Sequence, residues 1–369
     1  MRAAFTALLI IFLQAQNPQS APKPNAAATG QETSSKSAAQ NVSQLQAAAN
    51  SGNPSAQFKL AQAYASGNGV PQDDQMAFEW YSRAANQGYS DAEVDLAIMY
   101  LMGDAVKEDK LQALLWFKKA TRQGNATAMY NLGAIYYDGD GIPVDDGLSY
   151  AWFTLAKEAG YPKAAEAVQR AESEKNPSLI TDGFKKIAAM YDAGDCLPLN
   201  HAEALKWWMK AAASKDPEAQ IAVASELLNG QGVPQDFAQA RHWCEIAAKE
   251  GDARGEYCLG LIEQRGLGVA PDPPRARKSY ERSAAARNRQ AMKALAGMQA
   301  RGEGGKLDLV SAYVLYARLA SQGDKEALKA LATIKNMKPG DWKKVDQELL
   351  LYRIDPAKLA FALKQLDSH

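Results

Sequence analysis

The ten residues Tyr64–Asp73, "YASGNGVPQD", return along the chain in three further copies. One copy is "LLNGQGVPQD" at 227–236, and two weaker ones are "YYDGDGIPVD" at 136–145 and "EQRGLGVAPD" at 263–272. A glycine-rich loop that cradles a nucleotide follows a strand, carries a third glycine and occurs once per site. Four copies therefore indicate a turn of a repeating architecture rather than a nucleotide site.

Landmark residues recur around this stretch with a period of 36. The sets are Ala56, Ala92 and Ala128; Leu60, Leu96 and Leu132; Tyr64, Tyr100 and Tyr136; Gly67, Gly103 and Gly139; Trp80, Trp116 and Trp152; and Gly88, Gly124 and Gly160. Six sets in one register predict a tandem repeat. The order of landmarks continues to Gly323, which gives seven complete units and a half unit at each end.

The first unit shows how each repeat forms two helices. Ala56, Leu60 and Tyr64 recur every four residues, which places them on one face of a helix, and a glycine follows as a helix C-terminus commonly requires. Either Asp73 or Asp74 can cap a second helix. The sequence therefore predicts an all-α protein in which the glycine loop lets the chain turn between two antiparallel helices.

Composition argues against several functional classes. The chain has 369 residues with 42 Lys+Arg and 42 Asp+Glu, so its net charge is zero and it lacks the basic excess of a nucleic-acid binder. Its three cysteines and three histidines form no CxxC or HxxxH pair, and no nucleophile elbow or zinc signature occurs. We therefore expect no metal, no cofactor and no catalytic site. We interpret His201, His242 and His369 as surface or helix-packing residues.

The N-terminal stretch "MRAAFTALLIIFLQAQ" has the pattern of a secretory signal peptide, with Arg2 before a largely apolar run over 3–13. This run is too short to span a bilayer. We expect a leader over 1–15, with a buried helix start as the alternative, and a disordered Pro/Ala/Ser-rich linker over 16–37. The expected location is periplasmic or secreted, without a membrane span once the leader is removed. The alternative location is the endoplasmic reticulum, where the chain would act as an adaptor.

These units resemble the Sel-one-like repeat (SLR) family, which is related to tetratricopeptide repeats. The family pattern, roughly A-x3-LG-x2-Y-x2-G-x-GV with a later A-x2-WY-x2-AA-x2-G, fits "ATAMYNLGAIYYDGDGIPVDD" at 126–146 and continues to Gly160. The resemblance covers residues 38 to about 331. It implies a right-handed α/α superhelical solenoid, in which stacked helix pairs share a core because one pair alone cannot bury its aromatic face.

The period breaks over 161–180, where the sequence is "YPKAAEAVQRAESEKNPSLI". This stretch predicts an extra helix that ends at Asn176-Pro177-Ser178. We expect this insertion to act as an internal cap with a bend or hinge, dividing the array into sub-stacks over 38–175 and 176–331. Residues 332–369 have a similar pattern and are expected to form C-terminal capping helices.

Two loops depart from the repeat. The loop "GDAV" at 103–106 lacks the second glycine, and "GDCLPLN" at 194–200 belongs to a unit that closes on Lys215 instead of glycine. We expect both loops to be less regular than the others.

The cysteines allow two interpretations. Cys244 and Cys258 lie on either side of the turn at 251–252 and could face each other across an antiparallel helix pair. Cysteine-rich relatives within the family that these units resemble use disulfides between helices, and a bridge is possible in an exported protein. Two buried free thiols are the interpretation that we favour from the sequence. Cys196 is left unpaired under either one.

The resemblance also suggests where a partner binds. In tetratricopeptide-type stacks the first helices line the concave side, so first-helix residues away from the core stripe are the candidates. The predicted partner-binding residues are Phe58, Gln62, Val94, Ile98, Leu101, Tyr130, Tyr137, Asp138, Ile221 and Tyr257. Their middle group is apolar, and exposed apolar patches often mark interaction sites. The alternative is that packing between repeats buries these side chains.

The leading hypothesis is a non-catalytic scaffold of the cell envelope that holds a protein or peptide partner, of unknown identity, in the groove of the solenoid. The first alternative is a module that binds cell-wall glycan such as peptidoglycan, since aromatic grooves can stack on sugars. A β-lactamase-like hydrolase, which some relatives resemble, is the least favoured alternative, since no Ser-x-x-Lys motif occurs within the repeats.

Overall fold

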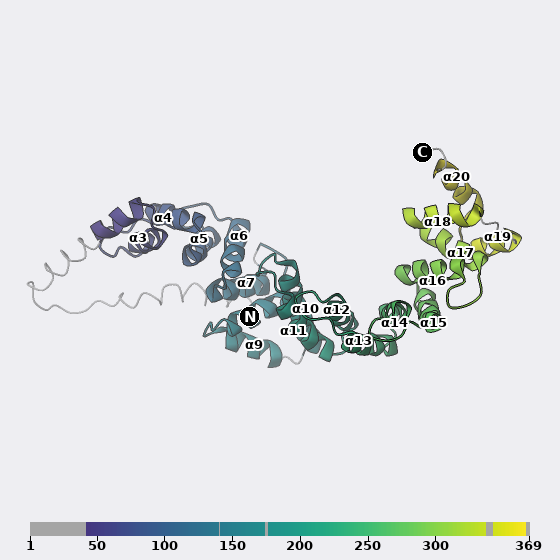
Figure 1. Cartoon of the computed structure of the whole chain (residues 1–369). Coiled ribbons are helices and arrows are strands. Elements are labelled where there is room, and N and C mark those ends of the chain that lie inside the picture. The colour runs from purple at the N-terminus through teal and green to yellow at the C-terminus, as the bar shows by residue number, and fades with distance from the viewer. Residues whose placement is uncertain (1–41, 140, 174–175, 337–341, 367–369) are drawn as a thin grey trace, which may run out of the picture. The chain divides into compact units, whose positions relative to one another are not determined.

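The computed structural model describes residues 42–139, 141–173, 176–336 and 342–366. Within these ranges the chain consists of helices joined by turns, without a strand, as the sequence predicts (Figure 1). The predicted leader and linker lie outside the described residues.

The helices follow one another as first and second helices of successive repeats, after a helix over 42–50 that corresponds to the N-terminal half unit. They are α3 (Pro54–Ser66), α4 (Asp74–Asn86), α5 (Ser90–Met102), α6 (Lys110–Arg122), α7 (Ala126–Asp138), α8 (Asp146–Glu158), α9 (Ala164–Ser173), α10 (Pro177–Ala193), α11 (His201–Ala213), α12 (Pro217–Asn229), α13 (Phe237–Lys249), α14 (Ala253–Arg265), α15 (Pro273–Ala285), α16 (Arg289–Arg301), α17 (Leu309–Ala320), α18 (Lys325–Asn336), α19 (Trp342–Leu351) and α20 (Pro356–Leu366).

The ends of these helices are set by side-chain and glycine caps. The carboxylate of Asp73 accepts a hydrogen bond from the amide of Met76 at the start of α4, over 3.0 Å. The side chain of Asn53 caps α3 in the same way. Gly67 ends α3 with φ of 68°, in the left-handed region where glycine is favoured. The caps expected from the sequence are therefore present.

One backbone hydrogen bond closes the quoted loop at its two ends. The amide of Asp73 donates to the carbonyl oxygen of Tyr64 over 3.0 Å. The same bond joins Asp109 to Tyr100, Asp145 to Tyr136, Asn200 to Tyr191, Asp236 to Leu227, Asp272 to Glu263 and Asp308 to Gln299, at 2.8–3.0 Å. This bond joins the last turn of each first helix to the N-cap of the second helix. The two helices of every repeat are therefore connected with a similar geometry.

The alanine, leucine and tryptophan landmarks lie in the core. Trp80, Trp116 and Trp152 are all buried. Small residues let helices approach closely: a Cβ atom on Gly133 of α7 would lie 2.7 Å from the ring of Phe153 on α8. The period of 36 therefore records the residues that each helix pair buries and the glycines that end its helices.

The inserted helix is present as α9, which packs against α8. The next first helix, α10, also packs against α8, so close that a Cβ atom on Gly183 would overlap the ring of Tyr150. The loop after α10 reaches the end of α6, where the Thr121 hydroxyl donates to the carbonyl oxygen of Cys196 over 2.9 Å. Within this part of the chain the core continues through the insertion.

The described residues fall into two compact units, which divide between Lys210 and Ala211. The first unit holds the helices up to α10 and most of α11. The second begins with the end of α11 and includes α18, α19 and α20, which add Ile334, Val345 and Leu363 to its core. The sub-stack boundary and hinge expected within 161–180 stay a prediction.

The loop at 103–106 keeps the repeat geometry despite its missing glycine. Ala105 adopts φ of 61° where Gly69 and Gly141 stand in neighbouring repeats, and the loop-closing bond is retained. An alanine in this region is strained because its Cβ atom approaches the backbone carbonyl. The loop therefore keeps a regular geometry, with local strain at Ala105. The prediction that this loop would be less regular than the others was wrong.

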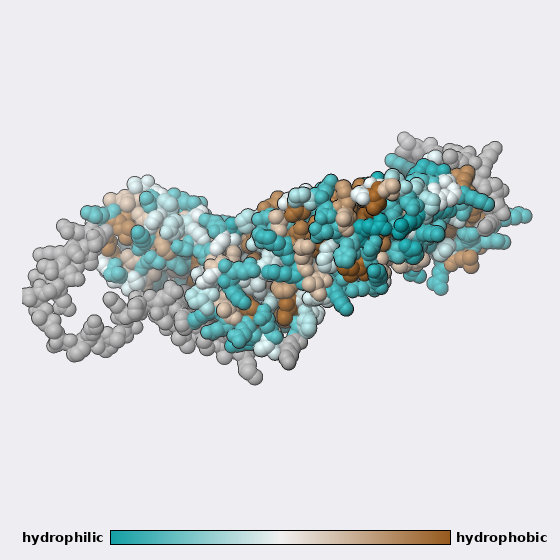
Figure 2. Space-filling view, turned by 60° about the horizontal axis from the view of Figure 1, so that its bottom comes forward, coloured by the Kyte–Doolittle hydropathy of each residue, from teal (hydrophilic) through white to brown (hydrophobic). Residues whose placement is uncertain are grey.

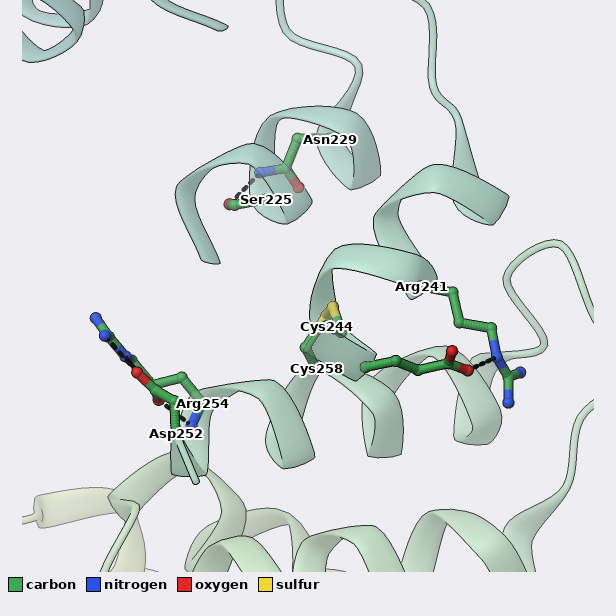
Figure 3. The surroundings of a disulfide bond; sticks show 8 residues. Ser225, Asn229, Arg241, Cys244, Asp252, Arg254 and Cys258 are labelled. Atoms are coloured by element: carbon green, nitrogen blue, oxygen red, sulfur yellow. Dashed lines mark hydrogen bonds and ion pairs between the residues drawn. A yellow bond between two sulfur atoms is a disulfide. The ribbon is translucent and has the colours of Figure 1, made fainter. Parts of the chain in front are cut away.

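A disulfide joins Cys244 of α13 to Cys258 of α14, with Cα atoms 5.9 Å apart (Figure 3). The interpretation of two buried free thiols was therefore wrong. Gly255 stands where most repeats have alanine, and a Cβ atom there would lie 2.7 Å from the carbonyl oxygen of Cys244. The two helices thus approach closely at the bridge. Cys196 is free and buried, as the sequence suggests.

Replacing Ala105 with glycine relieves the strain at this position, so we expect A105G to raise the free energy of unfolding by about 1 kcal/mol. The matched control is A189G, at an exposed position inside α10, which we expect to lower it by about 1 kcal/mol because glycine weakens a helix interior. Urea unfolding of both variants checks this. Destabilisation by A105G would contradict the strained turn.

Removing the bridge with the double substitution C244A/C258A should lower the free energy of unfolding by about 3 kcal/mol, because the loop it closes no longer restricts the unfolded chain. Urea unfolding with and without reductant measures this. Reductant should destabilise the wild-type chain but leave the double variant unchanged, and equal responses would disprove the bridge.

Candidate interaction surface

Five of the predicted partner-binding residues occupy one position of the repeat, on the first helices α3, α5, α7, α12 and α14. They are Phe58, Val94, Tyr130, Ile221 and Tyr257, of which Phe58, Ile221 and Tyr257 are half-buried. The Phe58 ring lies 5.0 Å from that of Tyr89 and 5.8 Å from that of Tyr81. This position therefore contributes to packing between helices as well as to the surface.

Val94 and Tyr130 are buried, at 4% and 7% exposure. Tyr130 stacks on Tyr161 with ring centroids 4.5 Å apart and tilts against Phe153 at 5.2 Å. At these two positions, packing within the stack buries the side chain. The alternative to partner binding, burial between repeats, therefore holds for both residues. They offer a partner little surface.

The inserted helix α9 closes this end of the first-helix surface. Burial raises the pKa of Tyr130 to about 12, and the charges of Glu166 and Arg170 on α9 also act on it. The Tyr150 hydroxyl on α8 donates to the carboxylate of Glu172 over 3.1 Å. One face of α9 thus lies beside Tyr130, where it limits the access of a partner to this residue.

In the first unit, the predicted residues that keep accessible surface lie on α3, α5 and α7. Gln62 is exposed, and Ile98, Leu101 and Tyr137 are half-buried, as is Asp138, which interacts within the fold. We call the set of Phe58, Gln62, Ile98, Leu101 and Tyr137 the open row. On the face drawn in Figure 2, apolar side chains form separate patches among polar ones rather than one continuous strip.

A half-buried carboxylate on α5, Asp95, which sequence reasoning missed, lies one turn before Ile98. Burial raises the pKa of Asp95 to about 6, although a hydrogen bond from the Tyr81 hydroxyl opposes the shift. Burial, together with the charge of Asp95, raises the pKa of Tyr81 above its usual range. An acidic residue within the apolar segment "VDLAIMYL" was the available signal.

Three polar pairs, also missed, recur at one place in the repeats. Gln87 donates to Gln57 over 2.6 Å, Gln123 to Glu93 over 2.8 Å, and Gln220 to Glu250 over 2.9 Å. In each pair a buried first-helix side chain meets the residue after the second helix. The pairs satisfy polar groups that would otherwise be buried alone.

His201 has a packing role. Its Nδ1 lies 3.0 Å from one carboxylate oxygen of Asp192, and the Trp208 indole donates to the other over 2.7 Å. His242 is exposed, and His369 lies outside the described residues.

Comparison with known families accounts for this architecture. The Sel1 repeat family model matches residues 54–89, 90–125, 126–161, 186–216, 217–252, 253–288 and 289–324. The chain belongs to the Sel1 repeat family. The seven matches confirm the seven complete units predicted from the period, and the skipped segment after 161 corresponds to the inserted helix. Sel1 repeat proteins generally act in protein–protein interaction, and they are typically non-catalytic.

Solved Sel1 repeat structures are similar to the chain. A protective antigen of uropathogenic Escherichia coli strains, which displays an SLR fold, shares 30% identity over 87% of this chain and 73% of its own, with a TM-score of 0.42. A Sel1 repeat protein from Oxalobacter formigenes shares 28% identity over 81% of both chains, with a TM-score of 0.39. No curated protein matches the chain.

No helix among the described residues has the length and apolar character needed to cross a bilayer.

Because the pKa of Asp95 is higher in the folded than in the unfolded chain, its charge destabilises the fold as the pH rises from about 4 to about 6. We expect D95N, which removes this charge, to raise the free energy of unfolding at pH 7.5 by up to about 3 kcal/mol. The gain should disappear near pH 4. Urea unfolding across this range measures it.

The control is D104N, at an exposed loop carboxylate. It should change stability little at any pH. If D95N gave the same gain at pH 4 and pH 7.5, the effect would not come from a buried charge.

Proposed function

We propose that the chain is a non-catalytic scaffold of the cell envelope that holds a protein partner against the open row. The observation that carries this proposal is the open row itself, where Phe58, Ile98, Leu101 and Tyr137 keep apolar surface on the three consecutive first helices α3, α5 and α7. Apolar side chains that the fold leaves accessible on adjacent elements suit a partner that buries them. The family's general role in protein–protein interaction supports the same conclusion.

Two observations support export. The N-terminal residues have the pattern of a secretory leader. The disulfide between Cys244 and Cys258 suits an oxidising compartment, because reducing systems keep most cytosolic thiols free.

The perturbed groups beside the open row support binding rather than catalysis. Asp95 is engaged by the Tyr81 hydroxyl, and Glu93 by Gln123, so both carboxylates already have partners in the fold. The geometry thus favours a surface that is organised before a partner arrives.

Photo-crosslinking in cells tests the proposal. With p-benzoylphenylalanine at Gln62 or Leu101, we expect light to join the chain covalently to one and the same protein, because both positions face the proposed partner. The matched control position is Glu79, which is exposed on the second helix α4 and should not crosslink to it. Mass spectrometry identifies the adducts.

Equal labelling of that protein from all three positions would contradict a specific surface. Co-sedimentation of the purified chain with insoluble peptidoglycan tests the glycan alternative. Sedimentation abolished by L101D, without protein adducts in cells, would replace the proposed protein partner with a cell-wall glycan.

A further inference from the structure

A cavity of about 450 Å³ lies within the second unit, beside the ends of α17 and α19. Its lining includes Met292 of α16 and the segment 351–354, which runs from the last residue of α19 toward α20. This volume falls in the range of sites that bind small ligands or side chains of a partner.

Three arginines converge on this cavity from separate parts of the chain. Arg287 follows α15, Arg318 lies in the last turn of α17, and Arg353 follows α19. Among the described residues, the guanidinium groups of these three arginines form no ion pair and no hydrogen bond. Other arginines of this unit do pair: Arg282 binds Glu256 over 2.7 Å and Arg301 binds Glu303 over 2.7 Å.

The cavity is strongly biased toward anions. Its described lining contains the three arginines, Ser321 and Gln322 but no aspartate or glutamate. Guanidinium groups bind carboxylates through two parallel hydrogen bonds, and like charges brought together without partners repel one another. An anionic ligand would relieve this repulsion.

The backbone adds to this evidence. Arg287 stands where other repeats close with glycine, and both Arg287 and Arg353 have positive φ, of 64° and 58°. Side chains other than glycine are strained in this region, and such strain often marks a functional position. Two of the three arginines are therefore held where glycine would be easier to accommodate.

An apolar rim borders the charged cavity. Leu351 is 80% exposed and Tyr352 is 48% exposed. The Arg318 guanidinium lies over the Tyr352 ring, 4.2 Å from its centroid. A small inorganic anion would leave this rim uncovered, whereas a peptide with both acidic and apolar side chains would engage both parts.

We propose that this arginine pocket, defined by Arg287, Arg318, Arg353, Leu351 and Tyr352, binds an acidic peptide segment of a protein partner. Carboxylates of the segment lie on the guanidinium groups, and an apolar side chain covers Leu351 and Tyr352. The inference rests on the proposed interaction function, but it concerns a surface of the second unit that is separate from the open row.

Fluorescence anisotropy of the purified full chain tests the proposal with two labelled peptides, Gly-Glu-Leu-Glu-Glu-Leu-Glu-Gly and its all-glutamine counterpart. We expect only the glutamate peptide to bind, and its affinity to fall as salt rises. R318Q and R353Q should each weaken binding about tenfold. R318K keeps the positive charge but cannot form two parallel hydrogen bonds with a carboxylate. Its affinity for the glutamate peptide should therefore lie between those of the wild-type chain and R318Q.

The matched control is R301Q, whose arginine is exposed and paired with Glu303 outside the pocket; it should bind normally. Thermal unfolding confirms that each variant is folded. L101D should leave the affinity for the glutamate peptide unchanged. Failure of the proposed partner site at the open row can therefore be distinguished from failure of the proposed peptide site in the arginine pocket. Equal binding of both peptides, or normal affinity in R318Q and R353Q, would overturn the proposal. So would binding of inorganic phosphate or anionic phospholipid vesicles without the glutamate peptide.

Discussion

The backbone hydrogen bond between the N-cap amide of each second helix and a carbonyl near the end of each first helix is the constraint on which the repeats depend. It recurs in all seven, even where the loop lacks a glycine or where asparagine replaces aspartate. Because a helix pair cannot bury its aromatic face alone, it must present a similar geometry to the next pair. A bond at a fixed separation in the sequence supplies that regularity locally, before the pairs stack.

The features that distinguish this chain from a regular repeat array lie where its sequence departs from the repeat. Gly255 replaces alanine beside the disulfide, where α13 and α14 approach closely. The inserted α9 lies beside Tyr130 and shortens the accessible first-helix surface. Arg287 takes the place of a closing glycine and lines the cavity of the second unit. Since each repeat contacts mainly its neighbours, such local changes leave the rest of the array intact.

The two units offer chemically different surfaces. The open row of the first unit is mostly apolar, with a protonatable carboxylate at Asp95 nearby. The arginine pocket of the second unit combines unpaired cations with an exposed tyrosine, a pairing of residue types that often carries binding energy at interfaces. A scaffold with two such surfaces can select partners by charge at one and by apolar contact at the other.

The sequence by itself determined the helices, their caps, the turns and the number of repeats, because these depend on interactions within a few residues of one another. It also indicated the inserted helix. Only the tertiary structure decided that Cys244 meets Cys258, that Val94 and Tyr130 are covered while Ile98 and Leu101 are not, and that Arg287, Arg318 and Arg353 share one cavity. Periodicity says which way a side chain points along its helix. What lies against it depends on neighbouring helices that the local pattern does not specify.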